Sequence, residues 1–232
     1  MIKIEQTADG SNTLYVPELD EHYHSVKGAL TESEHIFIRT GLNHSPAVSP
    51  RVLEIGFGTG LNAFLTLLEA DRAQRKVHYT TIERFPVAED TVRSLKYPEQ
   101  ICPQRAEDFY ALHSAAWDTD CQLTDFFTLH KVEADFTACP FGDGYDVIYF
   151  DAFAPEKQPE MWSQELFDRL YASLNPGGIL VTYCAKGVVR RMLQSSGFQM
   201  ERLPGPPGGK REILRGTRMI KNTHGVRCDF MR

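Results

Sequence analysis

Apolar residues follow two alternating patterns along most of the chain, short runs rich in apolar residues and longer segments with helical spacing. The short runs predict strands at residues 52–55, 77–82, 145–150 and 179–183, and the spaced segments predict helices at 61–68, 87–95, 106–115, 161–174 and 188–196. Strands that alternate with helices are typical of a mainly parallel, doubly wound α/β sheet. One further stretch, residues 122–133, is ambiguous but is expected to contain a strand that ends at Ala134-Asp135.

The alternation of strands and helices is interrupted near the C-terminus. We expect Pro176-Gly177-Gly178 to break the chain before the strand at 179–183. Two consecutive strands are predicted at 198–203 and 212–218, around a turn rich in glycine and proline. They indicate a C-terminal antiparallel hairpin that closes the sheet.

The first fifty residues precede the alternating pattern and are predicted to form a small N-terminal extension. Residues 2–7 and 13–16 alternate apolar and polar positions as hairpin strands do. A helix is expected to start at Thr31, with Glu34 as its capping-box partner, and to end near Gly41. The chain is thus divided into an extension at 1–50, a hairpin and a helix packed on the main domain, and one α/β domain at 51–232.

Composition narrows the class of protein. The 232 residues contain no apolar run of membrane-spanning length and begin with a polar segment unlike a signal peptide, so no membrane association is expected. The five cysteines, at 102, 121, 139, 184 and 228, form no CxxC pair, which is unlike a disulfide framework or a zinc site. A cytoplasmic protein without a metal is the expectation.

Charge is distributed unevenly. From Val181 to the end there are 11 basic and 3 acidic residues, a balance of +8, whereas the rest of the chain has 14 basic and 28 acidic residues, a balance of −14. A basic segment on an acidic body is compatible with a phosphate-binding face. On charge alone, a merely solvated basic surface explains it equally well.

The first predicted strand of the main domain runs directly into the turn Gly56-Phe57-Gly58-Thr59-Gly60. Glycines allow a ligand to approach the backbone closely, and open α/β sheets bind ligands at this end of their strands. The GxGxG spacing, preceded by Glu54, is more typical of S-adenosylmethionine (SAM) sites than of dinucleotide sites, which prefer GxGxxG. A turn that only packs the helix on the strand remains the alternative.

Two acidic residues occupy the ends of the next strands. Glu83 ends the second strand, where a carboxylate can accept hydrogen bonds from both ribose hydroxyls of an adenosine group. Asp135 has the position of an adenine contact after the third strand, although a solvated turn residue explains it as well.

Asp151 ends the fourth predicted strand and opens the proline-rich loop Ala152-Phe-Ala-Pro155. Methyl transfer from a sulfonium requires a lone pair aligned with the methyl carbon, and an ammonium must first lose a proton to provide one. A carboxylate beside the methyl donor can orient an amine and take that proton. Asp151 is therefore the predicted catalytic residue; an aspartate that only caps the loop is the alternative.

Several reactive side chains are given no role at this point. His22 and His24 have no partner with metal-ligand spacing and are expected at the surface. His113 and His130 carry no functional signal. Cys184 is expected to be a buried, inert thiol, because no basic partner can be assigned to it.

The chain resembles the methyltransferase half of the bifunctional bacterial tRNA wobble-uridine enzymes named MnmC, and their stand-alone relatives named MnmD. The resemblance covers nearly the whole sequence. It is carried by Asp20-Glu-His-Tyr23-His-Ser25, Gly56-Phe-Gly-Thr-Gly-Leu-Asn62, Glu83-Arg-Phe-Pro86, Asp151-Ala-Phe-Ala-Pro155, Pro159-Glu-Met161-Trp162, Val189-Arg-Arg191 and Gly209-Lys-Arg-Glu212. It implies a Rossmann-like SAM-dependent methyltransferase fold for residues 51–232.

The resemblance also implies a reaction, methylation of the exocyclic amine of 5-aminomethyl-2-thiouridine at position 34 of tRNA. Asp151 matches the family's active-site aspartate, and Tyr23 and Ser25 match a motif that closes over the cofactor. The expected SAM-binding set comprises Tyr23, Ser25, Glu54, Gly56, Phe57, Gly58, Gly60, Leu61, Asn62, Glu83, Arg84, Asp135 and Asp151.

The expected partner is a tRNA anticodon stem-loop. Basic residues are expected to contact its phosphates and aromatic residues to stack on its bases, since RNA recognition commonly uses unpaired loops. The expected substrate-binding set comprises Phe153, Lys157, Trp162, Lys186, Arg190, Arg191, Lys210 and Arg211, although Trp162 is equally compatible with a place in the core.

Two departures from the family matter. Ala152 follows the aspartate where the family often has glycine. The flavin-dependent oxidase half is not expected in this chain, so no FAD is expected, and the aminomethyl substrate would come from another pathway or a separate oxidase.

Three other functions remain open on the same fold, because a fold does not fix a function. The first is a SAM enzyme acting on a small amine, or an aminopropyltransferase. The second is a non-catalytic SAM- and RNA-binding protein, which an intact Asp151 disfavours. The third, an NAD-dependent dehydrogenase, is disfavoured by the GxGxG turn and the Asp151 loop.

Overall fold

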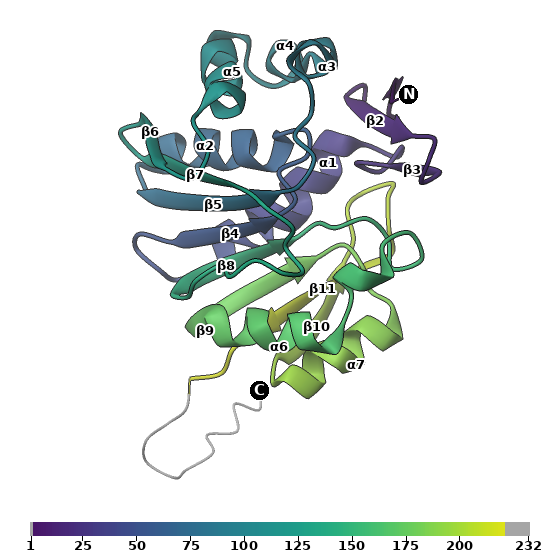
Figure 1. The fold of residues 1–232 in the computed structure, drawn as a ribbon, viewed down its shortest axis with the longest axis vertical. Helices are drawn as coiled ribbons and strands as arrows, with labels where there is room; N and C mark the ends of the chain where they lie inside the picture. The colour runs from purple at the N-terminus through teal and green to yellow at the C-terminus, as the bar shows by residue number, and fades with distance from the viewer. Residues whose placement is uncertain (1, 221–232) are drawn as a thin grey trace.

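The computed structural model describes residues 2–220. Its main sheet has eight strands in the order β10-β11-β9-β8-β4-β5-β7-β6 (Figure 1). The five central strands are parallel: β4 (Arg51–Ile55), β5 (Val77–Glu83), β7 (Phe127–Glu133), β8 (Tyr145–Phe150) and β9 (Leu174–Thr182). The edges are antiparallel, formed by β6 (Asp120–Thr124) on one side and by β10 (Gln199–Pro204) and β11 (Glu212–Thr217) on the other. The predicted doubly wound sheet with a C-terminal antiparallel hairpin is confirmed.

Helices cover both faces of this sheet (Figure 1). One apolar cluster contains Val147, Tyr149 and side chains of α2 (Leu61–Ala73) and α5 (Ala106–Ser114), and the other contains Ile148, Phe150 and side chains of α6 (Gln164–Ser173) and α7 (Gly187–Ser196). Because successive strand residues point to opposite faces, a strand covered on both sides must be apolar throughout. This explains why residues 147–150 of β8 are all apolar, whereas Asp146 lies at the start of the strand.

The remaining described elements are short. Helices α3 (Glu89–Leu95) and α4 (Tyr97–Ile101) lie beside α5, and single 3-10 turns occupy Leu42–His44, Pro103–Arg105 and Pro159–Met161. The sequence pattern did not reveal α4, which is only five residues long and has a proline in its first turn. No helix in residues 2–220 is long and apolar enough to cross a membrane.

The N-terminal segment forms a separate three-stranded antiparallel sheet of β1 (Lys3–Gln6), β2 (Asn12–Val16) and β3 (Glu21–His22). It is attached to the α/β domain by hydrogen bonds around Asn12, whose side chain donates to the Leu95 carbonyl at 2.9 Å and whose carbonyl accepts from the Tyr97 hydroxyl at 2.9 Å. The boundary at residue 50 between extension and main domain stays a prediction.

The first helix begins earlier than predicted. Helix α1 (Ala29–Ser33) starts after Gly28 and continues as a π-helical segment, η1 (Glu34–Arg39). Thr31 is therefore not the cap: its amide and hydroxyl both donate to Asp9 Oδ2, at 2.9 and 2.8 Å. The carboxylate that satisfies the start of the helix comes from a distant turn, which local sequence patterns cannot reveal.

Two further predictions need correction. The stretch 122–133 contains two strands in a hairpin, β6 and β7, where one strand was expected. The Pro176-Gly177-Gly178 segment does not break the chain, since β9 runs through it from Leu174 with a shift in register. Gly177 donates to the Arg218 carbonyl and Arg218 donates to the Gly178 carbonyl, so backbone pairing overrides the local turn signal.

We predict that Gly60→Ala lowers the free energy of unfolding by about 2–4 kcal/mol. Gly60 has a φ of 73°, and a Cβ there would lie 2.6 Å from His113 Nε2, so strain and a clash add. Gly208→Ala is the matched control, because its φ is 72° but a Cβ would meet no atom within 4 Å; its loss should be only about 1–2 kcal/mol. Urea unfolding measures both, and equal losses would contradict the packing argument.

Candidate functional site

Two adjoining cavities open where β4, β5 and β8 end. The first cavity, of about 210 Å³, is lined by Tyr23, the turn at 56–59, Leu61, Asn62, residues 82–85, residues 134–137, Asp151 and part of the loop after it. The second cavity, of about 640 Å³, is lined by residues 21–26, Glu32, residues 151–155, residues 183–186 and residues 210–212. Tyr23, His24, Asp151, Ala152 and Phe153 line both. The predicted chemistry therefore gathers at one edge of the sheet, as parallel strands require.

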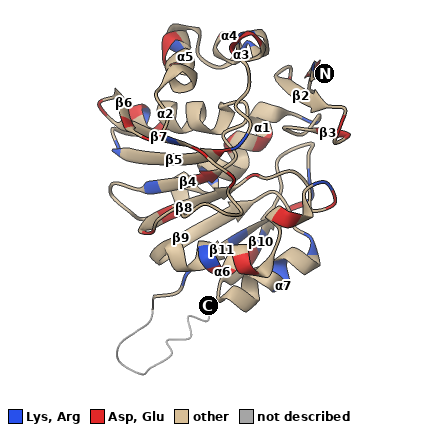
Figure 2. Ribbon diagram, in the orientation of Figure 1, with Lys and Arg blue, Asp and Glu red and all other residues tan. Residues whose placement is uncertain are grey.

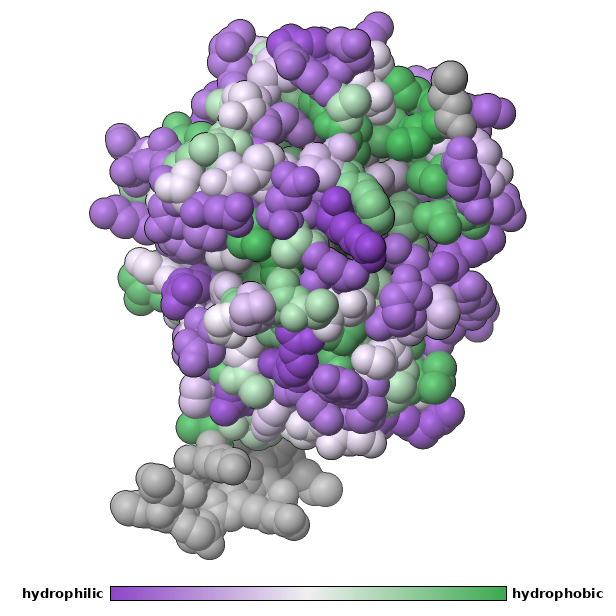
Figure 3. All heavy atoms as spheres, viewed as in Figure 1, coloured by the Kyte–Doolittle hydropathy of each residue, from purple (hydrophilic) through white to green (hydrophobic). Residues whose placement is uncertain are grey.

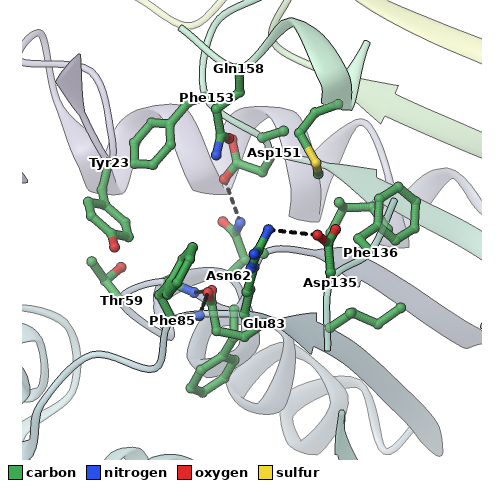
Figure 4. Close-up of a pocket in the computed structure, with 18 of the residues that line it drawn as sticks. Tyr23, Thr59, Asn62, Glu83, Phe85, Asp135, Phe136, Asp151, Phe153 and Gln158 are labelled. Atoms are coloured by element: carbon green, nitrogen blue, oxygen red, sulfur yellow. Dashed lines mark hydrogen bonds and ion pairs between the residues drawn. The ribbon is translucent and has the colours of Figure 1, made fainter. Parts of the chain in front are cut away.

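The glycine turn forms one wall of the first cavity. Gly56 has a φ of 87°, and a Cβ built there would meet nothing within 4 Å, so the space in front of it is open to a ligand. Glu83 closes the turn: its carboxylate accepts from the amides of Gly58 at 2.9 Å and Phe85 at 2.7 Å. Figure 4 shows Glu83, Asn62, Asp151 and Asp135 around one space.

The opposite wall is a charged pair over an apolar floor. Arg84 Nη1 lies 2.6 Å from Asp135 Oδ2, and Asp135 Oδ1 accepts from the amide and hydroxyl of Thr137. Ile55, Ile82, Ala134 and Phe136 form the apolar part. Phe85 also lies at this cavity, with 68% of its surface exposed, although no role was predicted for it from the sequence.

Asp151 lies where the two cavities meet. Its Oδ2 accepts a hydrogen bond of 2.9 Å from Asn62 Nδ2 (Figure 4). Burial raises the pKa of Asp151 to about 8; the Glu32 charge adds to this, while the Asn62 hydrogen bond and the Lys210 charge oppose it. A carboxyl group with such a pKa is a stronger base, once ionised, than an ordinary carboxylate.

Glu54 lies beneath the cavities and lines neither of them. Its side chain is fully buried on β4, where Thr81 donates to Oε2 at 2.9 Å while Oε1 has no hydrogen-bond partner. Burial raises the pKa of Glu54 to about 8, so the protonated acid predominates at neutral pH. The geometry places a neutral carboxyl behind Asn62 and gives no direct cofactor contact.

Residues 23–24 form a wall between the cavities that includes a buried histidine. His24 Nε2 lies 2.8 Å from Thr59 Oγ1, and burial lowers the pKa of His24 to about 4. Tyr23 packs edge-on against Phe153, with ring centroids 5.1 Å apart. The prediction that His24 is a surface histidine is wrong: it joins the N-terminal segment to the glycine turn.

The other histidines considered in the sequence also differ in how deeply they are buried. His22 is partly exposed and pairs with Glu5, and His130 is partly exposed and pairs with Asp120. His113 is largely buried, with Nε2 3.2 Å from the Thr59 carbonyl, and burial lowers its pKa to about 4. His113 thus supports the back of the glycine turn, a role that the sequence did not indicate.

The second cavity collects several residues of the predicted substrate set. Phe153, Lys186, Lys210 and Arg211 line it. Ser25 lines this cavity and not the first, so it lies apart from most of the predicted cofactor contacts. Cys184 is buried, and burial raises the pKa of its thiol, which agrees with an unreactive side chain.

The rest of the predicted substrate set lies elsewhere. Lys157, Trp162, Arg190 and Arg191 line neither cavity. Trp162 is 5% exposed, packs against Phe150 and donates its Nε1 to the Phe153 carbonyl at 2.7 Å. The expectation that Trp162 offers a stacking surface is therefore wrong; it is a core residue that fixes the loop carrying Phe153.

Four of the eight basic residues that the structure describes in the C-terminal segment form ion pairs within the protein. Lys186 pairs with Glu156, Arg202 with Glu212, Lys210 with Glu32 and Arg215 with Glu201. Figure 2 shows blue and red side by side in this region, and Figure 3 shows apolar residues only in small groups among polar ones on the same side. Cys228 and three of the segment's basic residues, Lys221, Arg227 and Arg232, lie outside the described residues. The net positive charge of the C-terminal segment is thus weaker evidence for RNA binding than the sequence suggested.

The family model described as S-adenosyl-L-methionine-dependent methyltransferase matches residues 101–219. The chain belongs to this family. SAM is accordingly the methyl donor of this methyltransferase.

Curated relatives of the methyltransferase carry a more specific name. The chain is 31% identical over 226 residues to the "tRNA 5-methylaminomethyl-2-thiouridine biosynthesis bifunctional protein MnmC" of Cupriavidus metallidurans, covering 90% of this chain and 33% of that protein. It is 34% identical over 218 residues to the protein of the same name from Pseudomonas savastanoi, covering 86% and 32%. The chain thus spans about a third of the length of these relatives, and the resemblance to their methyltransferase part is confirmed.

Solved structures confirm the fold. MNMC2 from Aquifex aeolicus superimposes with a TM-score of 0.69 at 24% identity, over 93% of this chain and 70% of that one. A spermidine synthase from Thermotoga maritima superimposes with a TM-score of 0.57 at 15% identity, over 94% and 72%.

The first cavity suits SAM in three respects. Glu83 presents a carboxylate beside the turn, the floor is apolar as an adenine ring requires, and the space at Gly56 is open. Residues 2–220 contain no group of three or more His, Cys, Asp or Glu side chains arranged to hold a metal.

We predict that Glu54→Gln stabilises the methyltransferase by about 2–4 kcal/mol near pH 7.5 and by almost nothing near pH 4. The folded pKa of Glu54, about 8, lies above the unfolded value of 4.5, so wild-type stability is complete below 4.5 and falls as pH rises through 8. Glutamine does not ionise in either state, so the variant avoids that loss. Urea unfolding across this pH range measures the difference, and a pH-independent difference would show that Glu54 is ionised in the fold.

Proposed function

We propose that this methyltransferase methylates the exocyclic amine of 5-aminomethyl-2-thiouridine at the wobble position of tRNA, giving 5-methylaminomethyl-2-thiouridine. The observation that carries the proposal is the position of Asp151, a carboxyl group with a raised pKa at the junction of the cavity beside the glycine turn and a second, wider cavity. The relatives' printed name, tRNA 5-methylaminomethyl-2-thiouridine biosynthesis, supplies the substrate.

The two cavities suit a direct transfer between two ligands. SAM supplies an activated methyl group when it is bound in the first cavity. The substrate amine enters through the second cavity and reaches Asp151, which lines both. Holding two reactants in line at near-attack distance is the enzyme's main contribution to such a displacement.

Asp151 then has two tasks. Its carboxylate accepts hydrogen bonds from the amine and orients the nitrogen lone pair, and it takes the proton that the nitrogen must lose. Asn62 holds Oδ2 in place through the 2.9 Å hydrogen bond, which leaves Oδ1 for the amine. The raised pKa reduces the difference in proton affinity between the carboxylate and an alkylamine.

The cofactor contacts follow from the first cavity. We assign the ribose hydroxyls to Glu83 and the adenine edge to Asp135, with Arg84 holding Asp135 in position. We assign further ligand contacts to Gly56, Phe57, Gly58, Leu61 and Asn62, because these residues line the same cavity. Gly60 and Glu54 act from behind, by shaping the turn and supporting Asn62.

The RNA contacts are assigned to the second cavity and its rim. Phe153 provides an aromatic face between the cavities, and Arg211 brings an exposed cation. Among residues 2–220, Arg191 and Arg211 form no ion pair and are exposed, which leaves them available for phosphate contacts. Phosphate contacts of this kind position an RNA, and a base in the cavity provides specificity.

A small-amine substrate suits this arrangement less well. The second cavity is about three times the volume of the first, which is more space than a simple amine requires. In this proposal, a separate oxidase supplies the tRNA that carries the aminomethyl group.

The direct test is mass analysis of position-34 nucleosides after tRNA carrying 5-aminomethyl-2-thiouridine is incubated with the protein and SAM. Conversion to the methylaminomethyl nucleoside is expected with tRNA and absent with spermidine or putrescine as acceptor. Methylation of the small amines without conversion of tRNA would overturn the proposal in favour of a small-amine enzyme.

We predict that Asp151→Asn lowers the single-turnover methylation rate by about 10²–10⁴-fold while SAM still binds. Wild-type kcat/KM should rise with pH and level off at or below about pH 8, where Asp151 becomes ionised. The asparagine variant should keep rising towards about pH 10, the range of a free alkylammonium. Equal rates at neutral pH would leave Asp151 without a role as proton acceptor.

A further inference from the structure

The ammonium group of Lys210 lies in the second cavity, although the residue belongs to the loop between β10 and β11. Its Nζ lies 3.7 Å from the centroid of the Tyr183 ring and 3.4 Å from Glu32 Oε2. Carboxylate and aromatic face together are the surroundings that proteins use to bind alkylammonium ions. Lys210 is thus bound by the protein as a primary ammonium ligand would be.

The two groups that hold this ammonium belong to fixed parts of the fold. The Glu32 side chain is only 8% exposed on α1, and its Oε1 accepts from the Ser25 amide at 3.3 Å. Tyr183 follows β9, and its hydroxyl donates to the Ala152 carbonyl at 2.8 Å. The site would therefore keep its shape if the Lys210 side chain left.

Lys210 itself is attached to a more adaptable part of the chain. It follows the sequence Pro206-Pro-Gly-Gly209 in the connection between two strands, and 40% of its side chain is exposed. Arg211, next in sequence, also lines the cavity. A rotation of the long lysine side chain is enough to carry its charge from the cavity to an RNA backbone outside.

The site adjoins the reacting group. Asp151 lines the same cavity, and the charges of both Glu32 and Lys210 act on its carboxyl group. An ammonium bound between Glu32 and Tyr183 is therefore close to the carboxylate that must take its proton. An aminomethyl substrate needs a site that binds its ammonium group beside a proton acceptor before methyl transfer, and this site meets both requirements.

Building on the proposed function, we propose that Glu32 and Tyr183 form the binding site for the cationic aminomethyl group of the substrate, which Lys210 occupies until RNA binds. The substrate ammonium replaces the lysine ammonium, and Lys210 pairs with a phosphate of the incoming RNA. The buried carboxylates face one cation before and after the exchange, so no uncompensated charge is left in the cavity.

The site can be tested without RNA. Lys210→Ala removes three carbons and the ammonium, the size of n-propylammonium, so this ion should bind Lys210→Ala in calorimetry with a dissociation constant in the millimolar range. Wild type should bind it at least about tenfold more weakly, because Lys210 occupies the site. Neutral 1-propanol should bind neither protein.

Two further variants identify the groups responsible. Adding Glu32→Gln or Tyr183→Leu to Lys210→Ala should abolish propylammonium binding, whereas Tyr183→Phe, which keeps the aromatic face, should retain it. Each double variant must keep the SAM affinity of Lys210→Ala, which shows that the fold is intact. Absence of propylammonium binding to Lys210→Ala, or its persistence after Glu32→Gln, would overturn the proposal.

A kinetic test connects the site to the substrate. Glu32→Gln should raise KM for an aminomethyl-thiouridine stem-loop by about tenfold or more, with kcat changed much less, because a charged hydrogen bond to the ground-state ammonium is lost. If wild type methylates the stem-loop and Glu32→Gln does not change KM, this inference fails while the proposed function stands. If wild type does not methylate it, the proposed function fails, and propylammonium binding still decides whether the ammonium site exists.

Discussion

The parallel pairing of β4 with β5 on one side and β8 on the other is the constraint on which the rest of the molecule depends. Ile55 is in register with Ile82 and with Phe150, so the next residues along the three strands emerge together at one edge. These residues are Gly56, Glu83 and Asp151, the turn, the carboxylate and the proton acceptor of the proposed mechanism. A shift of one residue in either pairing would turn one of these groups to the wrong face of the sheet.

Burial of ionisable groups around this edge has opposite effects on acids and bases. It raises the pKa values of Glu54 and Asp151 to about 8 and lowers those of His24 and His113 to about 4. In each case the neutral form is favoured, because a low-dielectric environment destabilises charge of either sign. These four buried groups are therefore largely uncharged near neutral pH in the free protein, and a cationic ligand shifts Asp151 towards its ionised form.

The sequence predicted the parts of this architecture that depend on local pattern. The strands predicted at 52–55, 77–82 and 145–150 match β4, β5 and β8 almost to the residue, and the glycine spacing located the turn. It failed where a distant group decides the outcome. Asp9 determines where α1 begins, Arg218 keeps β9 intact through a Pro-Gly-Gly segment, and Phe150 with Phe167 buries Trp162. His24 was misjudged for the same reason, since its partner Thr59 is 35 residues away.

The wall between the two cavities has a consequence for how the molecule is assembled. Residues 20–25 leave the ribosome before the glycine turn and the strands on which they dock have been made, because chains are synthesised from the N-terminus. The small β1-β2-β3 sheet has to wait, attached later through Asn12 and His24 to residues near 59 and 95–97. This segment thus docks only once the chain has been made to about residue 97, and a ligand that touches both Tyr23 and the glycine turn would hold the two parts of the chain together.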